Sequence, residues 1–280
     1  MTDINDIIFA GGIIATIILI ARRSSRYKNA IGVTANNHFL PDDVSREVKL
    51  VYAGDELNFP DETIITVLEK HFPYFKTLSG EKKKIFLLRL QKFISAKTFV
   101  IHNDNGFREM PVLISATAIK LSMGLKHFML PHYTQIHIFP AEFIGLYPNL
   151  RVLTGNVSGN KIHISWKHFL EGYQFSEDGQ NVGLHEMAHA YYYQNFVIQE
   201  DVDDNFVDQF HIFNDTGNTV FEKEKHTPAP LYSTYGLTNF QEFWAESVEL
   251  FFEKSLSFKN TYGELYYIMV NILNQDPCRD

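Results

Sequence analysis

The segment at residues 181–193 constrains the fold most strongly, because it places three ionisable side chains inside an apolar stretch. It reads NVGLHEMAHAYYY, with His185 and His189 four residues apart and Glu186 directly after the first histidine. Residues four apart lie on one face of a helix, so the two imidazole rings should converge. We expect Asn181 to cap a buried helix here, and buried ionisable groups need partners. The chain must therefore fold around a polar centre.

Two converging histidines can bind one zinc ion, for which imidazole is a common ligand. Helix geometry turns Glu186 by about 100° from His185, which places it beside the metal rather than on it. There Glu186 can take a proton from a water molecule that the metal activates. The alternative is a His–Glu pair on the solvated face of an amphipathic helix, but the apolar neighbours argue against it. The pattern predicts a zinc site with Glu186 as general base.

Tetrahedral zinc needs a third protein ligand, and the composition limits its type. The chain has a single cysteine, and no further histidine follows His189 at the spacing found in metzincins. A carboxylate from a second helix is the remaining choice. The segment 239–252, which Thr238 or Asn239 can cap, carries three glutamates on one face: Glu242, Glu246 and Glu249. The alternative reading of this segment is a solvated acidic stripe.

Several separated blocks carry a resemblance to a known family. They read LSGEKKKIFLLRLQKFISAKTFV at 78–100, IHIFPAEF at 136–143, NVGLHEMAHAYYY at 181–193 and YGLTNFQEFWAESVELFF at 235–252, and further blocks lie at 111–125, 159–173 and 274–277. These blocks resemble the zinc-dependent peptidases related to Mlc titration factor A and, more distantly, the catalytic domain of anthrax lethal factor. The apolar N-terminus that precedes them departs from the soluble family pattern.

The resemblance implies which residues build the site. His185 and His189 would bind Zn²⁺, and Glu242, which opens the segment EFWA, would be the third ligand. Tyr235, seven residues earlier, would stabilise the oxyanion. Glu246 stands one turn after Glu242, where thermolysin-like enzymes place an acid that accepts the free N–H of a ligating histidine, and we assign it that role. The alternative for Glu246 is an ordinary solvated or ion-paired glutamate.

The implied fold is α+β and predominantly helical, a zincin-like metallopeptidase domain with a small sheet. Hydrophobic spacing agrees with this class, since it predicts helices over 61–70, 79–95 and 110–125, a strand over 134–139 and a hairpin over 151–166. An extended peptide substrate could pair with the strand at 135–139 or with the strand at 161–166, unless both are internal to the sheet.

The N-terminus carries an apolar run, IIFAGGIIATIILIA at residues 7–21, followed by Arg22 and Arg23. Basic residues after the run, and none before it, are typical of a membrane anchor whose following domain is cytoplasmic. We therefore expect one transmembrane helix within an anchor at 1–24, a juxtamembrane linker at 25–55 and a catalytic domain at 56–280. This organisation predicts a single-pass protein of the inner (cytoplasmic) membrane with a cytoplasmic catalytic domain. The alternative is a buried core helix.

The formal charge of −8 argues against a nucleic-acid partner, whose phosphates need a basic surface. The sequence predicts a zinc metallopeptidase, of endopeptidase or aminopeptidase type, that acts on a peptide or protein substrate. The alternative is a membrane-tethered module that sequesters a cytoplasmic regulatory protein, such as a transcriptional regulator, with a structural zinc ion. Glu186 favours the enzyme, because a structural site has no use for a general base.

Overall fold

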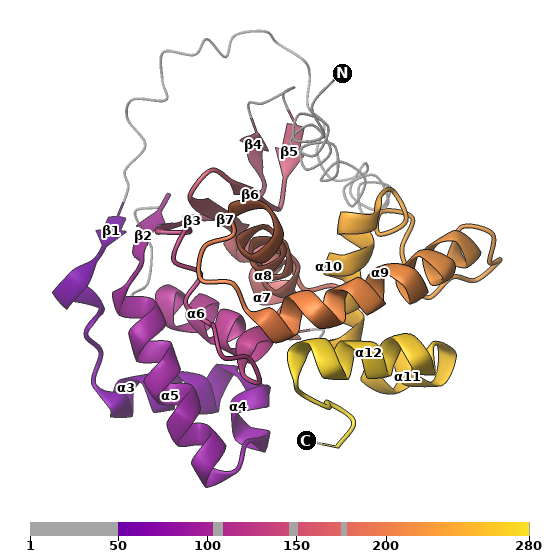
Figure 1. Ribbon diagram of the computed structural model, residues 1–280. Helices are drawn as coiled ribbons and strands as arrows, with labels where there is room; N and C mark the ends of the chain where they lie inside the picture. Colours follow the sequence, from indigo (N-terminus) through magenta and orange to yellow (C-terminus); the bar gives the residue numbers. More distant parts are fainter. Residues whose placement is uncertain (1–49, 103–108, 146–150, 175–177, 280) are drawn as a thin grey trace, which may run out of the picture.

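The computed structural model describes residues 50–102, 109–145, 151–174 and 178–279. These residues form a mostly helical α+β fold around a small mixed sheet, as the sequence predicts (Figure 1). The predicted anchor at 1–24 and the part of the predicted linker at 25–49 lie outside this part of the chain. Within the described ranges, no helix has both the length and the apolar character that a membrane span requires.

The sheet contains five strands in the order β1–β2–β3–β7–β6, which span Leu50–Tyr52, Thr98–Ile101, Gln135–Phe139, Lys161–Ser165 and Gly155–Ser158. The strands β2, β3 and β7 run parallel, and the outer strands β1 and β6 are antiparallel to their neighbours. Alternation along each strand buries one face, which carries Ile136 and Ile138 on β3 and Ile162 and Ile164 on β7. A separate ladder joins β4 (Phe143–Gly145) to β5 (Arg151–Leu153).

The helices account for most of the remaining described residues. In chain order they are η2 Gly54–Leu57, α3 Asp61–His71, α4 Pro73–Thr77, α5 Gly80–Ser95, α6 Glu109–Ser122, α7 Trp166–Gln174, α8 Val182–Tyr193, the π-helical turn η3 Gln194–Ile198, α9 Asp204–Glu224, α10 Phe240–Glu253, α11 Ser255–Thr261 and α12 Gly263–Leu273. The helices predicted over 61–70 and 79–95 are confirmed as α3 and α5, and the third predicted helix ends at Ser122 as α6.

Two boundaries differ from the sequence prediction. Strand β1 lies within the range 25–55 that was predicted as a linker, and it pairs with β2 at the edge of the sheet. The segment predicted as one hairpin over 151–166 is divided between two sheets, since β5 pairs with β4 while β6 pairs with β7. Trp166, expected to end a strand, begins α7.

Helix α8 lies in the middle of the fold, between the sheet and α10. It packs on β6 and β7 on one side and on α6 and α10 on the others (Figure 1). The Trp244 indole of α10 donates a hydrogen bond to the Ala188 carbonyl of α8 at 3.0 Å. Behind Trp244, the rings of Phe206, Phe210 and Phe213 from α9 meet it edge to face, an arrangement favourable for aromatic pairs. This packing fixes α10 against α8.

Candidate metal centre

Helix α8 begins as the sequence predicts. The Asn181 side chain caps it by accepting a hydrogen bond from the Leu184 backbone N–H at 3.0 Å, which satisfies one of the amides left open at a helix start. His185, Glu186 and His189 are all buried, so the prediction of a buried helix with three ionisable side chains is confirmed. Asn181 also bonds to side chains of α10, and together with the Trp244 hydrogen bond it fixes the position of α8 relative to α10.

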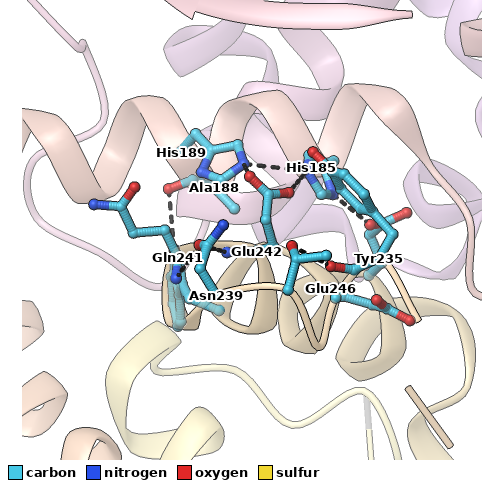
Figure 2. A network of polar contacts seen from close by, with 12 residues as sticks. His185, Ala188, His189, Tyr235, Asn239, Gln241, Glu242 and Glu246 are labelled. Atoms are coloured by element: carbon cyan, nitrogen blue, oxygen red, sulfur yellow. Dashed lines mark hydrogen bonds and ion pairs between the residues drawn. The ribbon is translucent and has the colours of Figure 1, made fainter. Parts of the chain in front are cut away.

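The two histidines converge on Glu242 of α10 (Figure 2). His185 Nε2 lies 2.9 Å from Glu242 Oε2, and His189 Nε2 lies 3.2 Å from Glu242 Oε1. The two Nε2 atoms are 3.1 Å apart. The structure therefore brings together the three residues that the sequence analysis selected, and each presents one potential ligand atom within 4.8 Å of the others.

The chemistry of this donor set fits zinc. Two imidazole nitrogens and one carboxylate form the His₂Glu set of thermolysin-type catalytic sites, which leave one coordination position open. The two Nε2 atoms point at each other and at the same buried carboxylate, an arrangement that a shared cation would stabilise. The set His185, His189 and Glu242 can therefore hold a metal ion without a change of fold.

Glu249, two turns after Glu242 on α10, orients the first of these histidines. Its Oε1 lies 2.6 Å from His185 Nδ1, and its Oε2 accepts a hydrogen bond from the Asn181 backbone N–H. A carboxylate at Nδ1 keeps the proton on that nitrogen and leaves Nε2 free to bind a metal. Burial alone lowers the pKa of His185, but the carboxylates of Glu249 and Glu242 raise it well above its usual value.

Glu242 is held in its charged form by the same arrangement. Burial by itself raises the pKa of its carboxyl group, but the imidazoles of His189 and His185 lower the pKa far below its ordinary value. A carboxylate that stays ionised in a buried place is a suitable ligand for a divalent cation. The electrostatics therefore agree with the role predicted for Glu242.

The role predicted for Glu246 is wrong. Its carboxylate bonds to Ser233, in the loop before α10, and Glu249 takes the place beside His185 that was assigned to it. The reason is helix geometry, because residues seven apart almost coincide around the axis whereas residues four apart differ by about 40°. Glu249 therefore shares the direction of Glu242, and Glu246 turns toward the loop.

A pocket opens beside the three potential ligands, and Glu186 is part of its wall. The lining residues are Asn156, Val157, His185, Glu186, His189, Tyr193 and Glu242. Burial raises the pKa of the Glu186 carboxyl group to about 7. A Cβ atom at Gly155, the first residue of β6, would come within 2.3 Å of Glu186 Oε1. The glycine therefore lets this strand pass close to the carboxylate.

Tyr235 lies near the site without lining the pocket. It is buried in the loop before α10, and its ring centroid is 6.0 Å from that of His185 (Figure 2). The structure thus brings Tyr235 to a potential metal ligand, and its part in stabilising an oxyanion stays a prediction.

Three pocket residues were missed by the sequence analysis: Asn156, Val157 and Tyr193. Tyr193 had a signal, since it follows His189 by four residues and shares its helix face. Its hydroxyl donates a hydrogen bond to Gln241 Oε1 at 3.1 Å. Asn156 and Val157 belong to β6, which only the strand order of the sheet brings to the site.

Comparison with known proteins places this geometry in context. The model of the family described as glucose-regulated metallo-peptidase M90 matches residues 52–273, from β1 to the end of α12. The chain is also similar to an uncharacterized protein of Synechocystis sp., slr2042. The two are 24% identical over an alignment of 229 residues, and the match covers 72% of this chain and 80% of that relative.

Proposed function

This chain belongs to the glucose-regulated metallo-peptidase M90 family, and from that premise we propose that it hydrolyses peptide bonds at a zinc ion held by His185, His189 and Glu242. It is the family that the separated sequence blocks indicated. One observation carries the proposal: potential ligand atoms from α8 and α10 converge within 3.2 Å beside a pocket that a further buried glutamate, Glu186, also lines.

Zinc bound at this place would polarise the substrate carbonyl and lower the pKa of a water molecule. Glu186 lines the same pocket as the three ligands but is not one of them, so it is placed to accept the proton of the attacking water. The same carboxyl group then gives the proton to the leaving amine, as a general base and acid does in one cycle. Glu249 holds His185 in the tautomer that this arrangement requires.

Two phenols are candidates for the donor that stabilises the oxyanion. Tyr235 is the one that the family resemblance implies, and it packs against His185. Tyr193 lines the pocket itself, and its hydroxyl is fixed by Gln241. We keep Tyr235 as the proposed donor, and a comparison of Tyr235→Phe with Tyr193→Phe decides between them. Loss of one oxyanion donor lowers kcat by roughly 100-fold, whereas loss of a wall residue changes mainly KM.

The substrate backbone is proposed to pair with β6. Neither strand considered in the sequence analysis is available, because β3 lies between β2 and β7, and β7 lies between β3 and β6. Among the described residues, β6 is the edge strand on the β7 side of the five-stranded sheet. Its residues Asn156 and Val157 line the pocket. An extended peptide can add to such an edge through main-chain hydrogen bonds, which would lay its scissile bond across the pocket.

The test is the substitution Glu186→Gln in the full-length protein. We expect kcat on a peptide library to fall by about 10²–10⁴-fold, the usual contribution of a general base, while the zinc content stays unchanged. Glu264→Gln, at an exposed position on α12, is the matched control and should keep full activity. Undiminished hydrolysis by Glu186→Gln would overturn the mechanism.

The same experiment separates the enzyme from the alternative of a module that sequesters a regulatory protein with a structural zinc ion. A parent protein that carries zinc, cleaves no peptide of the library, and still captures its regulator after Glu186→Gln would favour the binding module.

We also propose that residues 7–21 hold the protein at the inner membrane, with the catalytic domain in the cytoplasm. The support is the uncharged run of residues and the arginines that follow it. Cell fractionation should find the full chain with membranes and a chain lacking residues 1–24 in the soluble fraction. Recovery of both forms in the soluble fraction would reject the anchor.

A further inference from the structure

Glu246 is a buried glutamate whose two oxygens are both used by one residue of the loop before α10. The Ser233 backbone N–H donates to Glu246 Oε1 at 2.6 Å, and the Ser233 hydroxyl donates to Glu246 Oε2 at 2.8 Å. The side chain of Glu246 is 7% exposed, so these bonds lie largely out of water. Two hydrogen bonds from one residue to both oxygens of one buried carboxyl group make this pair an effective clamp on the loop.

The Ser233 side chain, held by Glu246, also binds the backbone of Tyr235. While its hydroxyl donates to Glu246, the oxygen accepts the backbone N–H of Tyr235 at 3.2 Å and that of Gly236 at 3.1 Å. The Tyr235 carbonyl in turn accepts hydrogen bonds from the N–H and the hydroxyl of Thr238, at 2.9 and 2.7 Å. Tyr235 is therefore tied at both of its backbone groups.

The close fit of loop and carboxylate is visible at Gly236. A Cβ atom at this position would lie 1.7 Å from Glu246 Oε2, so only glycine lets the loop approach the carboxylate as it does. The result of this approach is the placement of the Tyr235 ring, which is 3% exposed and tilted by 38° against the ring of His185 (Figure 2).

We propose that Glu246 and Ser233 are positioning residues, which hold Tyr235 in place against His185 so that its phenol is ready for the reacting carbonyl. This inference rests on the proposed peptidase function, because it assigns Glu246 a task in the same site. It replaces the contact with a ligating histidine that the sequence suggested.

A second buried glutamate serves as a matched control, because it anchors the same loop one residue earlier. Glu224 of α9 is 1% exposed, and its Oε2 accepts the Tyr232 backbone N–H at 2.9 Å. The ring of Tyr232 stacks on Phe243, and its hydroxyl bonds to Ser247. Glu224→Gln therefore changes a carboxyl group that bonds to the loop into an amide, without touching the bonds that hold Tyr235.

The first measurement is backbone hydrogen exchange on the metal-free, full-length protein, which needs no catalytic activity. Glu246→Gln and Ser233→Ala should speed exchange of the Tyr235 and Gly236 amides by about 10-fold, because each removes a link of the clamp. Exchange along α8 should stay unchanged. Glu224→Gln should leave the Tyr235 and Gly236 amides protected, and Ser233→Thr, which keeps a hydroxyl, should restore their protection.

The second measurement is a double-mutant cycle on the zinc-loaded enzyme. Tyr235→Phe should lower kcat by roughly 100-fold and Glu246→Gln by about 10-fold, both with little change in KM. In the Tyr235→Phe background, Glu246→Gln should cost less than about 2-fold more, since the phenol that it positions is already gone. Glu224→Gln should keep kcat and should not couple to Tyr235→Phe.

Two results overturn the inference: unchanged exchange at Tyr235 and Gly236 in both clamp variants, or losses in kcat that multiply in the double variant. Failure of the proposed function has a different signature. A protein without peptidase activity would still show the exchange pattern if the clamp exists, so the two failures are distinguishable.

Discussion

Two clusters of ionisable side chains lie at opposite ends of the antiparallel helices α8 and α10, the first buried and the second half-buried with a lysine from α6, and they differ in how their members meet. At one end of the pair, His185, His189 and Glu242 place their ligand atoms within 3.2 Å of one another. At the other end, Glu253 and Lys120 face a second pocket, which Asn181 also lines. Glu253 Oε1 accepts a hydrogen bond from the Asn181 side chain at 2.8 Å, and the Lys120 ammonium lies over the Phe252 ring.

The difference shows how a candidate metal centre can be told from an ordinary charge cluster. In the first cluster, two imidazole nitrogens and a carboxylate converge on one point, an arrangement that a shared cation would stabilise. In the second, Glu253 Oε2 is buried without a hydrogen-bond partner among the described residues. Burial raises the pKa of Glu253 to about 8 and lowers the pKa of Lys120 to about 8. The pKa values of buried groups shift in both clusters, but only the first, among the described residues, brings three potential ligand atoms within 4.8 Å of one another.

The largest effect that tests this comparison is on zinc affinity. Glu242→Gln should weaken zinc binding by more than about 100-fold, because loss of a group that only supports a ligand already costs 10–100-fold. Glu253→Gln, the equivalent change in the second cluster, should alter affinity by less than about 3-fold. Competition against a fluorescent chelator measures both values. Equal losses in the two variants would remove the distinction between the clusters.

A substitution at Gly155 tests how closely strand β6 approaches the Glu186 carboxyl group beside the first cluster. An alanine at this position places a Cβ atom 2.3 Å from Glu186 Oε1 and must displace the carboxylate or the strand. A shift of about 1 Å can cost roughly 100-fold in rate, so we expect that loss in kcat with zinc still bound. Gly263→Ala is the control, since nothing lies within 4 Å of a Cβ atom there. Full activity of Gly155→Ala would show that Glu186 needs no fixed position.

A substitution of Glu249 tests whether the two clusters are connected. Its carboxylate contacts His185 of the first cluster and the backbone of Asn181, which lines the second pocket. Glu249→Gln should weaken zinc binding by about 10-fold, at the lower end of the range for such supporting groups, because the amide oxygen can still accept the His185 N–H. Titration of the metal-free variant with zinc gives the affinity. Parent-like affinity would mean that helix packing alone orients His185.

The smallest expected effect concerns stability against pH. Since the folded-state pKa of Glu253, about 8, is above its unfolded value, the folded protein binds more protons than the unfolded chain between roughly pH 4.5 and 8. The contribution of this group is therefore fully present below pH 4.5 and is lost as pH rises to 8. Glu253→Gln should reduce the accompanying fall in Tm by a few degrees in the metal-free protein, as thermal unfolding across this range would reveal. An identical pH dependence in both proteins would contradict it.

Local patterns predicted the parts of the site that lie on one helix. The apolar spacing, the cap at Asn181 and the i, i+4 histidines all depend on neighbours within two turns, and the structure agrees with each. Glu242 became the expected third ligand through the family blocks, since spacing alone left three glutamates on one face. The structure places Glu242 at the histidines.

Contacts between segments distant in sequence explain why the role of Glu246 was predicted wrongly and why β6 was missed. Helix periodicity turns Glu246 and Glu249 in different directions, but their roles depend on which element packs against each side of α10. The loop at Ser233 meets one of them, and α8 meets the other. The strand that borders the pocket was missed for the same reason. Its place follows from the order of strands in the sheet, and the pairing of β6 with β7 decides that order.

The sequence by itself determined the α+β class, the paired helices and the two histidines that converge on one helix face, because hydrophobic period and side-chain chemistry are local properties. Only the tertiary structure decided which glutamate orients His185, which strand lines the pocket and which residues hold Tyr235. Those assignments depend on how α8, α10 and β6 are turned toward one another. That orientation comes from packing across the whole core, which no short stretch of sequence encodes.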